Sequence, residues 1–196
     1  MQQRSRLQFL IEVAIFSAIG IVLDQISIKL WFQGGSISLT MVPIILMAFR
    51  WGLGGGLLTG LILGVLQMFA GAYIIHPVQG FLDYPAAYTV IGFAGLFAPL
   101  VAAAAKKGNK TAMIWAISAG TVLGGILRYV CHVLSGVVFF GATALDLGEN
   151  VWWYSIVYNA GYMIPSIILT AAVNALIFTA APRLLKLKQL KLQSVR

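Results

Sequence analysis

An arginine and a histidine lie four residues apart near the end of a long apolar run, at Arg128 and His132. Four residues of an α-helix turn by about 400°, so these side chains and Gly136 fall within an arc of about 80° on one helix face. Polar groups are costly inside a lipid bilayer, and where they occur they usually mark a functional site. If this helix spans a membrane, the pair predicts a site for a polar ligand, although a packing histidine and a structurally paired arginine are alternatives.

The composition indicates an integral membrane protein. Of the 196 residues, 60% are hydrophobic and only 9% are charged, whereas soluble domains carry about 25% charged residues. The 13 Lys and Arg outnumber the five Asp and Glu, but they follow the ends of apolar segments, which fits membrane topology better than nucleic acid binding. The single cysteine, Cys131, excludes an intramolecular disulfide and a cysteine-rich metal site.

We predict one all-α domain over residues 1–196, with six transmembrane helices in one bundle. A membrane-spanning helix needs about 20 mostly apolar residues. The predicted helices cover residues 7–24, 37–50, 52–75, 81–105, 111–140 and 151–181.

The placement of Lys and Arg predicts the orientation, because cytoplasmic loops are enriched in these residues. With six alternating spans, most of them lie on one side, at the N-terminus, in two loops and in the segment 183–196. Only Lys29 falls in a loop on the opposite side, and Arg128 falls inside a helix. Both termini are therefore predicted to be cytoplasmic, with 183–196 as a basic tail that could attract anionic lipid of the bilayer.

Counting from these basic residues places Asp83, His132 and Asn159 at one level. Each lies 22 to 24 residues from the basic residue at the other end of its helix, or roughly 33–36 Å at 1.5 Å per residue. The hydrocarbon core is about 30 Å thick. Three predicted helices therefore bring a carboxylate, an imidazole and an amide together near the outer interface.

Aromatic side chains crowd the same level, and the chemistry of the set suggests a ligand. An interfacial aromatic belt explains some of them, but not the ionisable groups among them. A carboxylate accepts from an amine, aromatic faces attract a ring cation, and an amide both donates and accepts. A flat, cationic, nitrogen-rich small molecule fits this pocket. The aromatic residues are Tyr73, Tyr84, Phe139, Phe140, Trp152, Trp153, Tyr154 and Tyr158.

Motifs along nearly the whole chain resemble the thiamin-binding S-component of energy-coupling factor (ECF) vitamin transporters. Single matches are weak, but their order and spacing together are fairly specific. The motifs are Ile11–Ala18, Pro43-Ile44, Phe49–Gly52, Gln79 with Asp83-Tyr84, Arg128-Tyr129 with His132, Gly136 and Phe139-Phe140, and Tyr154-Ser155 with Asn159 and Gly161.

The resemblance implies a subunit of the bacterial cell membrane that binds one thiamin near the outer face and docks on a transmembrane T-component carrying two ATPases. It implies docking through Ala14 and Ala18, whose spacing is otherwise explained by packing within the chain. The family's pocket acid is usually glutamate, and the aromatic that ends its fifth helix is typically tryptophan; here they are Asp83 and Phe140. The implied substrate contacts are Asp83, Tyr84, His132, Phe140, Tyr154, Asn159 and Tyr73.

We therefore predict a high-affinity thiamin-binding subunit with no cofactor and no catalytic residues. ATP hydrolysis is expected on partner subunits, because the chain has no G-x-x-x-x-G-K-[ST] motif. An S-component for another vitamin or precursor, such as hydroxymethylpyrimidine, is the first alternative. A stand-alone secondary transporter would normally show inverted repeats or helices broken near the midplane. An intramembrane enzyme using His132 and Asp83 is supported by no H-E-x-x-H or G-x-S-x-G motif.

Overall fold

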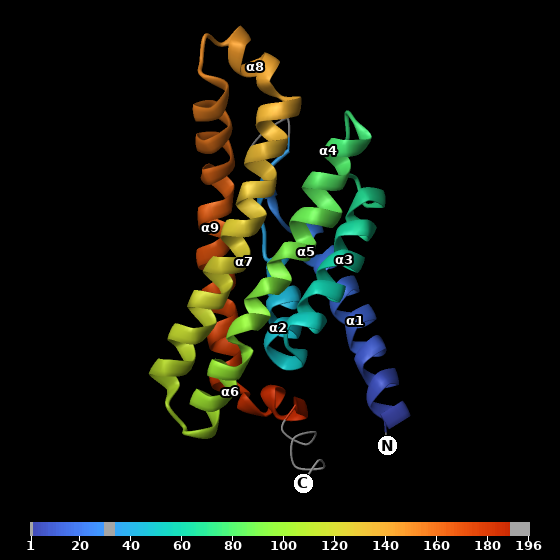
Figure 1. Cartoon of the computed structure of the whole chain (residues 1–196), viewed down its shortest axis with the longest axis vertical. Helices are drawn as coiled ribbons and strands as arrows, with labels where there is room; N and C mark the ends of the chain where they lie inside the picture. The colour runs from blue at the N-terminus through green and yellow to red at the C-terminus, as the bar shows by residue number, and fades with distance from the viewer. Residues whose placement is uncertain (1, 30–33, 189–196) are drawn as a thin grey trace.

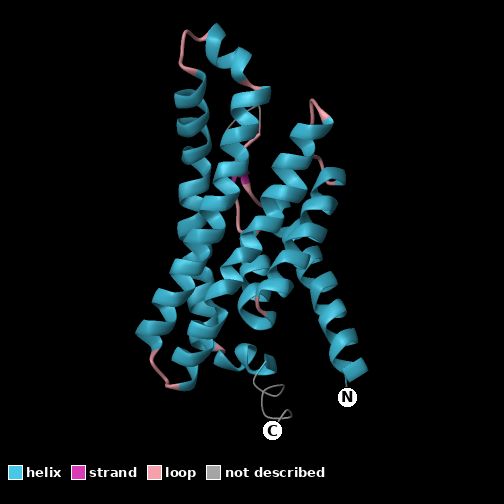
Figure 2. Cartoon of the chain, viewed as in Figure 1, coloured by secondary structure: helices cyan, strands magenta, loops and turns pink. Residues whose placement is uncertain are grey.

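The chain forms a bundle of α-helices, with one short two-stranded sheet inside it (Figures 1 and 2). A computed structural model describes residues 2–29 and 34–188. The sheet is antiparallel and pairs Ile28 with Ile37 and Lys29 with Ser36. The elements are α1 (Gln2–Gln25), β1 (Ile28–Lys29), β2 (Ser36–Ile37), α2 (Met41–Trp51), α3 (Leu53–Phe69), α4 (Pro77–Phe81), the π-helical turn η1 (Leu82–Ala86), α5 (Ala87–Ile91), the 3₁₀ turn η2 (Gly92–Phe97), α6 (Ala98–Lys106), α7 (Lys110–Phe139), α8 (Gly141–Asp146), α9 (Val151–Ala180) and the 3₁₀ turn η3 (Pro182–Lys188).

Four helical stretches in the described part of the chain are long and apolar enough to cross a membrane. Two further apolar helices, α2 and α3, are shorter. The prediction of an all-α membrane protein is therefore confirmed, while six spans remain a prediction. The four long stretches are Arg4–Gln25, Pro77–Lys106, Lys110–Phe139 and Val151–Ala180.

The second and third predicted helices are shorter in the structure than their apolar runs. The run 37–50 begins with strand β2, and its helix starts only at Met41. The run 52–75 is helical only to Phe69, because Gly71 adopts a φ of 99° that ends the helix. Hydropathy alone does not reveal these changes, since the residues on both sides of each boundary are apolar.

The fourth predicted helix, 81–105, starts earlier than expected and is irregular. It begins at Pro77, where the His76 side chain accepts a hydrogen bond from the Val78 backbone N–H at 3.1 Å and caps the helix. Pro85 has no N–H to donate to the preceding turn, and the chain around it widens into η1. This π-helical turn carries Asp83 and Tyr84.

Three glycines of α3 bring this irregular helix into close contact. Gly56, Gly60 and Gly64 repeat every four residues and lie against the backbone of residues 84–92. A Cβ atom at Gly64 would lie 2.6 Å from the Tyr84 carbonyl oxygen. The small-residue spacing therefore serves packing within the chain, as such motifs do in membranes, and it fixes the position of η1.

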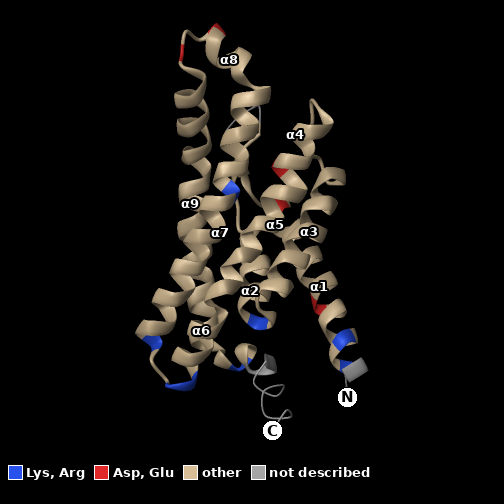
Figure 3. Ribbon diagram, viewed as in Figure 1, with Lys and Arg blue, Asp and Glu red and all other residues tan. Residues whose placement is uncertain are grey.

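Lys and Arg gather at the end of the bundle where α1 begins and α9 ends (Figure 3). There Arg50 donates from Nε to Glu12 Oε2 at 2.6 Å and from Nη2 to Oε1 at 2.8 Å. Trp51 Nε1 donates to Glu12 Oε2 at 2.7 Å, and Arg50 Nη1 donates to the Leu184 carbonyl at 2.6 Å. This cluster ties α1, α2 and η3 together. Of the predicted tail 183–196, residues 189–196 lie outside the described part of the chain.

Candidate functional site

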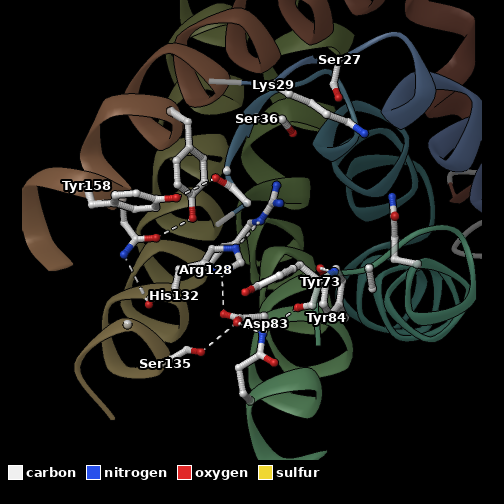
Figure 4. A pocket seen from close by; sticks show the side chains of 18 of the residues that line it. Ser27, Lys29, Ser36, Tyr73, Asp83, Tyr84, Arg128, His132, Ser135 and Tyr158 are labelled. Atoms are coloured by element: carbon white, nitrogen blue, oxygen red, sulfur yellow. Dashed lines mark hydrogen bonds and ion pairs between the residues drawn. The ribbon is translucent and has the colours of Figure 1, made fainter. Parts of the chain in front are cut away.

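A cavity of about 500 Å³ is lined by residues far from the basic end of the bundle, and Figure 4 shows it from close by. Its walls come from the C-terminal ends of α1 and α3, the segment 70–88, the sheet, the C-terminal half of α7 and the N-terminal half of α9. The structure brings all seven predicted contact residues to this one cavity. They are Tyr73, Asp83, Tyr84, His132, Phe140, Tyr154 and Asn159.

Asp83 is held by three hydrogen-bond partners that come from η1's own helix and from α7. Its Oδ2 accepts from Gln79 Nε2 at 2.6 Å and from Ser135 Oγ at 2.8 Å, and its Oδ1 lies 2.9 Å from His132 Nδ1. Figure 4 shows Asp83 meeting His132 and Ser135 across the space between η1 and α7. A carboxylate offers about four acceptor positions, so Asp83 keeps capacity for one further donor.

The protonation pattern of His132 follows from its second neighbour. Arg128 Nε donates to His132 Nε2 at 3.1 Å, and a guanidinium has no acceptor. His132 must therefore carry its ring proton on Nδ1 and donate it to Asp83. A neutral imidazole thus stands between the arginine and the carboxylate.

Arg128 is structurally paired, but with an imidazole and a phenol rather than with a carboxylate. Its described partners are His132 and Tyr88, whose hydroxyl accepts from Arg128 Nη2 at 3.2 Å. The guanidinium carbon also lies 4.4 Å from the centre of the Tyr88 ring, which gives a cation–π contact. Arg128 lines the cavity one turn below His132 and supports its wall.

Asn159 is buried, and neighbouring residues use most of its amide. Its Nδ2 donates to the Ser155 carbonyl at 2.8 Å, and its Oδ1 accepts from Tyr162 at 2.5 Å. The remaining capacity is chiefly the second lone pair of Oδ1. Asn159 is therefore fixed in orientation and can accept one hydrogen bond from the cavity.

Aromatic rings line two sides of the cavity. Tyr73 stacks on Phe140 with ring centres 6.2 Å apart, which joins the segment after α3 to the end of α7. Tyr84 accepts a hydrogen bond from the Tyr73 backbone N–H at 3.0 Å. On the other side, Tyr154 and Tyr158 follow one another along α9, with ring centres 5.8 Å apart. A flat ring can therefore be enclosed between aromatic faces.

Several polar residues of the lining were not predicted as ligand contacts from the sequence, although Gln79 was one of the motif residues. Gln79 lies one helical turn before Asp83, and Ser135 lies next to Gly136 on α7, so both could have been found from helix periodicity. Asp24 is an acid in the last turn of a helix, where the helix dipole disfavours negative charge. No feature of the sequence marks Gln67 as a residue of the cavity lining. Among residues 2–29 and 34–188, no group of three His, Cys, Asp or Glu side chains could hold a metal ion.

Comparisons with a family model, with known sequences and with solved structures agree on the family of this chain. Residues 10–186 match the family described as "Thiamine transporter protein (Thia_YuaJ)". The thiamine transporter ThiT of Bacillus subtilis is 46% identical over 189 residues, which are 95% of this chain and 98% of that protein. ThiT of Lacticaseibacillus paracasei is 32% identical over 188 residues, with 94% and 93% covered.

Solved structures share the fold. ThiT from Listeria monocytogenes is 31% identical and superposes with a TM-score of 0.86, covering 92% of this chain and 98% of its own. The S component of a bacterial ECF transporter gives a TM-score of 0.57 at 20% identity, covering 92% and 99%, and shares the fold alone. The resemblance to thiamin-specific S-components is thereby confirmed: the chain belongs to the thiamine transporter family, whose members are transport proteins and not enzymes.

Proposed function

We propose that the cavity binds thiamin with high affinity and that the chain captures this vitamin for ATP-driven uptake. The observation that carries the proposal is the arrangement of Asp83, which is fixed by three donors, keeps one acceptor position and faces a cavity with aromatic walls. The relatives in Bacillus subtilis and Lacticaseibacillus paracasei are thiamine transporters by name. The cavity volume also lies within the usual range of about 300–1,000 Å³ for small-molecule sites.

The proposed contacts follow from the groups that remain free. Thiamin joins an aminopyrimidine to a thiazolium ring, so it offers amine donors and a positive charge. Asp83 and the free lone pair of Asn159 are the acceptors for such donors. His132 and the rings of Tyr73, Tyr84, Phe140 and Tyr154 enclose the two heterocycles and stabilise the cation.

Docking on the T-component with its two ATPases uses α1 in this proposal. Ala14 and Ala18 are both exposed on one side of α1, together with Ile11, Ile15 and Ile19. A lipid-facing stripe of small residues allows another helix to approach closely. Six spans with both termini in the cytoplasm complete the proposal, supported by the basic residues at the end of the bundle away from the cavity.

A binding titration tests the function directly. The purified protein in detergent is titrated with thiamin, riboflavin, biotin and hydroxymethylpyrimidine by calorimetry. We expect nanomolar affinity for thiamin and no heat with riboflavin or biotin. Absence of binding at micromolar thiamin contradicts the proposal, and tighter binding of hydroxymethylpyrimidine assigns the site to that precursor instead.

Docking is tested separately by co-purification with a T-component and two ATPases. Ala14→Leu and Ala18→Leu place bulk on the proposed surface, whereas Val138→Leu adds bulk on an exposed face of α7. We expect the α1 variants to lose the complex while they retain thiamin. Retention of the complex by both contradicts docking through α1.

A further inference from the structure

Residues 70–76 connect α3 to α4 without regular secondary structure, and the first four of them line the cavity. Polar backbone groups outside helices and strands need partners from elsewhere. In this segment, side chains supply several of them. The Tyr73 backbone N–H donates to the Tyr84 hydroxyl at 3.0 Å, and two further backbone groups bond to Gln79.

Gln79, on α4, connects this segment to Asp83. The residue is 2% exposed. Its Oε1 accepts from the Ile75 backbone N–H at 3.1 Å, and its Nε2 donates to the Tyr73 carbonyl at 3.1 Å. The same Nε2 donates to Asp83 Oδ2 at 2.6 Å. Both N–H groups of the amide are therefore used within the protein. A reversed amide would place its nitrogen against a donor and its oxygen against two acceptors, so the orientation is fixed.

A ring contact holds the other side of the segment. Tyr73 stacks on Phe140 at the end of α7, with ring centres 6.2 Å apart. The Tyr73 side chain is nevertheless 46% exposed, so burial contributes little to its placement. The bonds of Gln79 and this stacking contact therefore fix where the Tyr73 ring lies relative to Asp83.

We propose that Gln79 is a positioning residue for ligand binding, which holds the Asp83 carboxylate and the Tyr73 ring in one fixed relation. The acceptor and the aromatic wall are then in place before the ligand enters. A ligand with a flat ring and an amine or cationic group binds to both without first ordering the segment 70–76, and such ordering lowers affinity where it must accompany binding. Because its N–H groups are already used, Gln79 acts through these two neighbours. The assignment rests on the proposed function, with thiamin as the ligand.

Gln79→Met tests the effect on affinity, because it keeps the length of the side chain and removes all three hydrogen bonds. We expect calorimetry to show thiamin binding about tenfold more weakly. Gln8→Met makes the same change at an exposed glutamine of α1 and should leave the affinity unaltered. Gln79→Asn carries an amide that is one methylene too short to reach both neighbours, and it serves as the second variant if Gln79→Met does not fold. Unchanged affinity in the folded Gln79 variant overturns the proposal.

Hydrogen exchange of the ligand-free protein tests the hold on the segment directly. In Gln79→Met the Ile75 N–H loses its acceptor, and we expect exchange within residues 70–76 to become about fivefold faster or more, with no change in Gln8→Met. Equal exchange in Gln79→Met and in the unmodified protein overturns the proposal. If the unmodified protein does not bind thiamin, the proposed function fails. If it binds thiamin and the Gln79 variants bind equally well, only the present inference fails.

A double-mutant cycle with Tyr73→Ala separates positioning of the ring from a general loss of stability. Tyr73→Ala removes the ring but keeps the backbone carbonyl that bonds to Gln79. If Gln79 positions the ring, the loss of thiamin affinity caused by Tyr73→Ala should be about threefold smaller or less in the Gln79→Met background, because the ring is already displaced there. The same cycle with Gln8→Met should be additive. Additive losses with Gln79→Met overturn the joint placement of the ring and the acid.

Discussion

Two clusters in this molecule join a carboxylate to an arginine, and they differ in what stands between the two charges. In the first, Arg50 contacts both oxygens of Glu12 directly, and Trp51 and Gln8 add a third and a fourth donor. In the second, Arg128 contacts His132, and only His132 reaches Asp83. The direct pair uses the carboxylate fully to hold helices together. The interposed imidazole leaves part of the carboxylate available to the cavity.

The difference teaches how to separate a structural ion pair from a binding one in a membrane protein. Bidentate arginine–carboxylate contacts neutralise both partners and have fixed geometry. A carboxylate held mainly by neutral donors, such as Gln79, Ser135 and the imidazole, keeps its negative charge while its orientation is fixed. A cation can then bind without first displacing an arginine.

Breaking the direct pair of Arg50 and Glu12 should have the largest effect. It should lower the stability of the fold and leave thiamin binding unchanged. Arg50→Ala leaves Glu12 partly buried without its cation, and we expect the free energy of unfolding to fall by about 3 kcal/mol, near the lower end for broken buried pairs. Thermal unfolding in detergent measures this. The folded fraction should bind thiamin with unchanged affinity; a selective loss of affinity would mean that the two clusters are coupled.

Neutralising Asp83, the carboxylate of the second cluster, should mainly lower the affinity for thiamin rather than the stability of the fold. Asp83→Asn is expected to weaken thiamin binding about a hundredfold, because a charge-assisted contact contributes about 1.5–3 kcal/mol. Glu12→Gln makes the same chemical change in the first cluster and serves as the control, with lower stability and unchanged affinity. Calorimetry and thermal unfolding of both variants give the comparison, and equal affinities for the two variants would assign Asp83 a structural role.

Removing the arginine of the second cluster should have a smaller effect, because it acts through His132. Arg128→Met leaves His132 Nε2 without its donor, so the imidazole is no longer restricted to the Nδ1-protonated form. We expect about a tenfold loss of thiamin affinity. Nitrogen NMR of the labelled histidine should show a mixture of the two neutral forms in the variant and one form in the unmodified protein. A single form in both would contradict the proposed function of Arg128.

Much of the cavity lining could be predicted from the sequence, because helix geometry converts residue counts into depth. Asp83, His132 and Asn159 lie on three different helices, yet their distances from the basic ends predicted one level, and all three line the cavity. The unequal use of their hydrogen-bonding groups could not be predicted in this way. The internal bonds of Asn159 to Ser155 and Tyr162 depend on side-chain orientations that residue counts do not contain.

Helix pairing and local breaks could not be predicted either. Asp24 and Gln67 line the same cavity only because α1 and α3 pack side by side in one particular register, with Gly20 against Leu63. The early end of α3 depends on the φ of Gly71, and the π-helical turn depends on Pro85, although both lie in apolar runs. The register depends on tertiary contacts and the breaks depend on single Gly and Pro residues, and hydropathy reports neither.

Enlarging an aromatic side chain of the cavity wall should have the smallest effect. It should change the affinity for thiamin and leave the Glu12–Arg50 cluster unaltered. Phe140 stacks on Tyr73 beside the cavity, and Phe140→Trp would offer a stronger face to a ligand cation. An increase of about threefold in thiamin affinity is expected, since cation–π contacts at exposed sites contribute about 0.5–1 kcal/mol. Trp152→Phe, at a residue that is 53% exposed and does not line the cavity, is the control and should change nothing. The gain should be absent with a neutral isostere of thiamin in which a thiophene replaces the thiazolium, because the quadrupole of the aromatic ring acts on charge. An equal gain with both compounds would show that Phe140 contributes contact area only, and that the cation is stabilised by the carboxylates rather than by the aromatic wall.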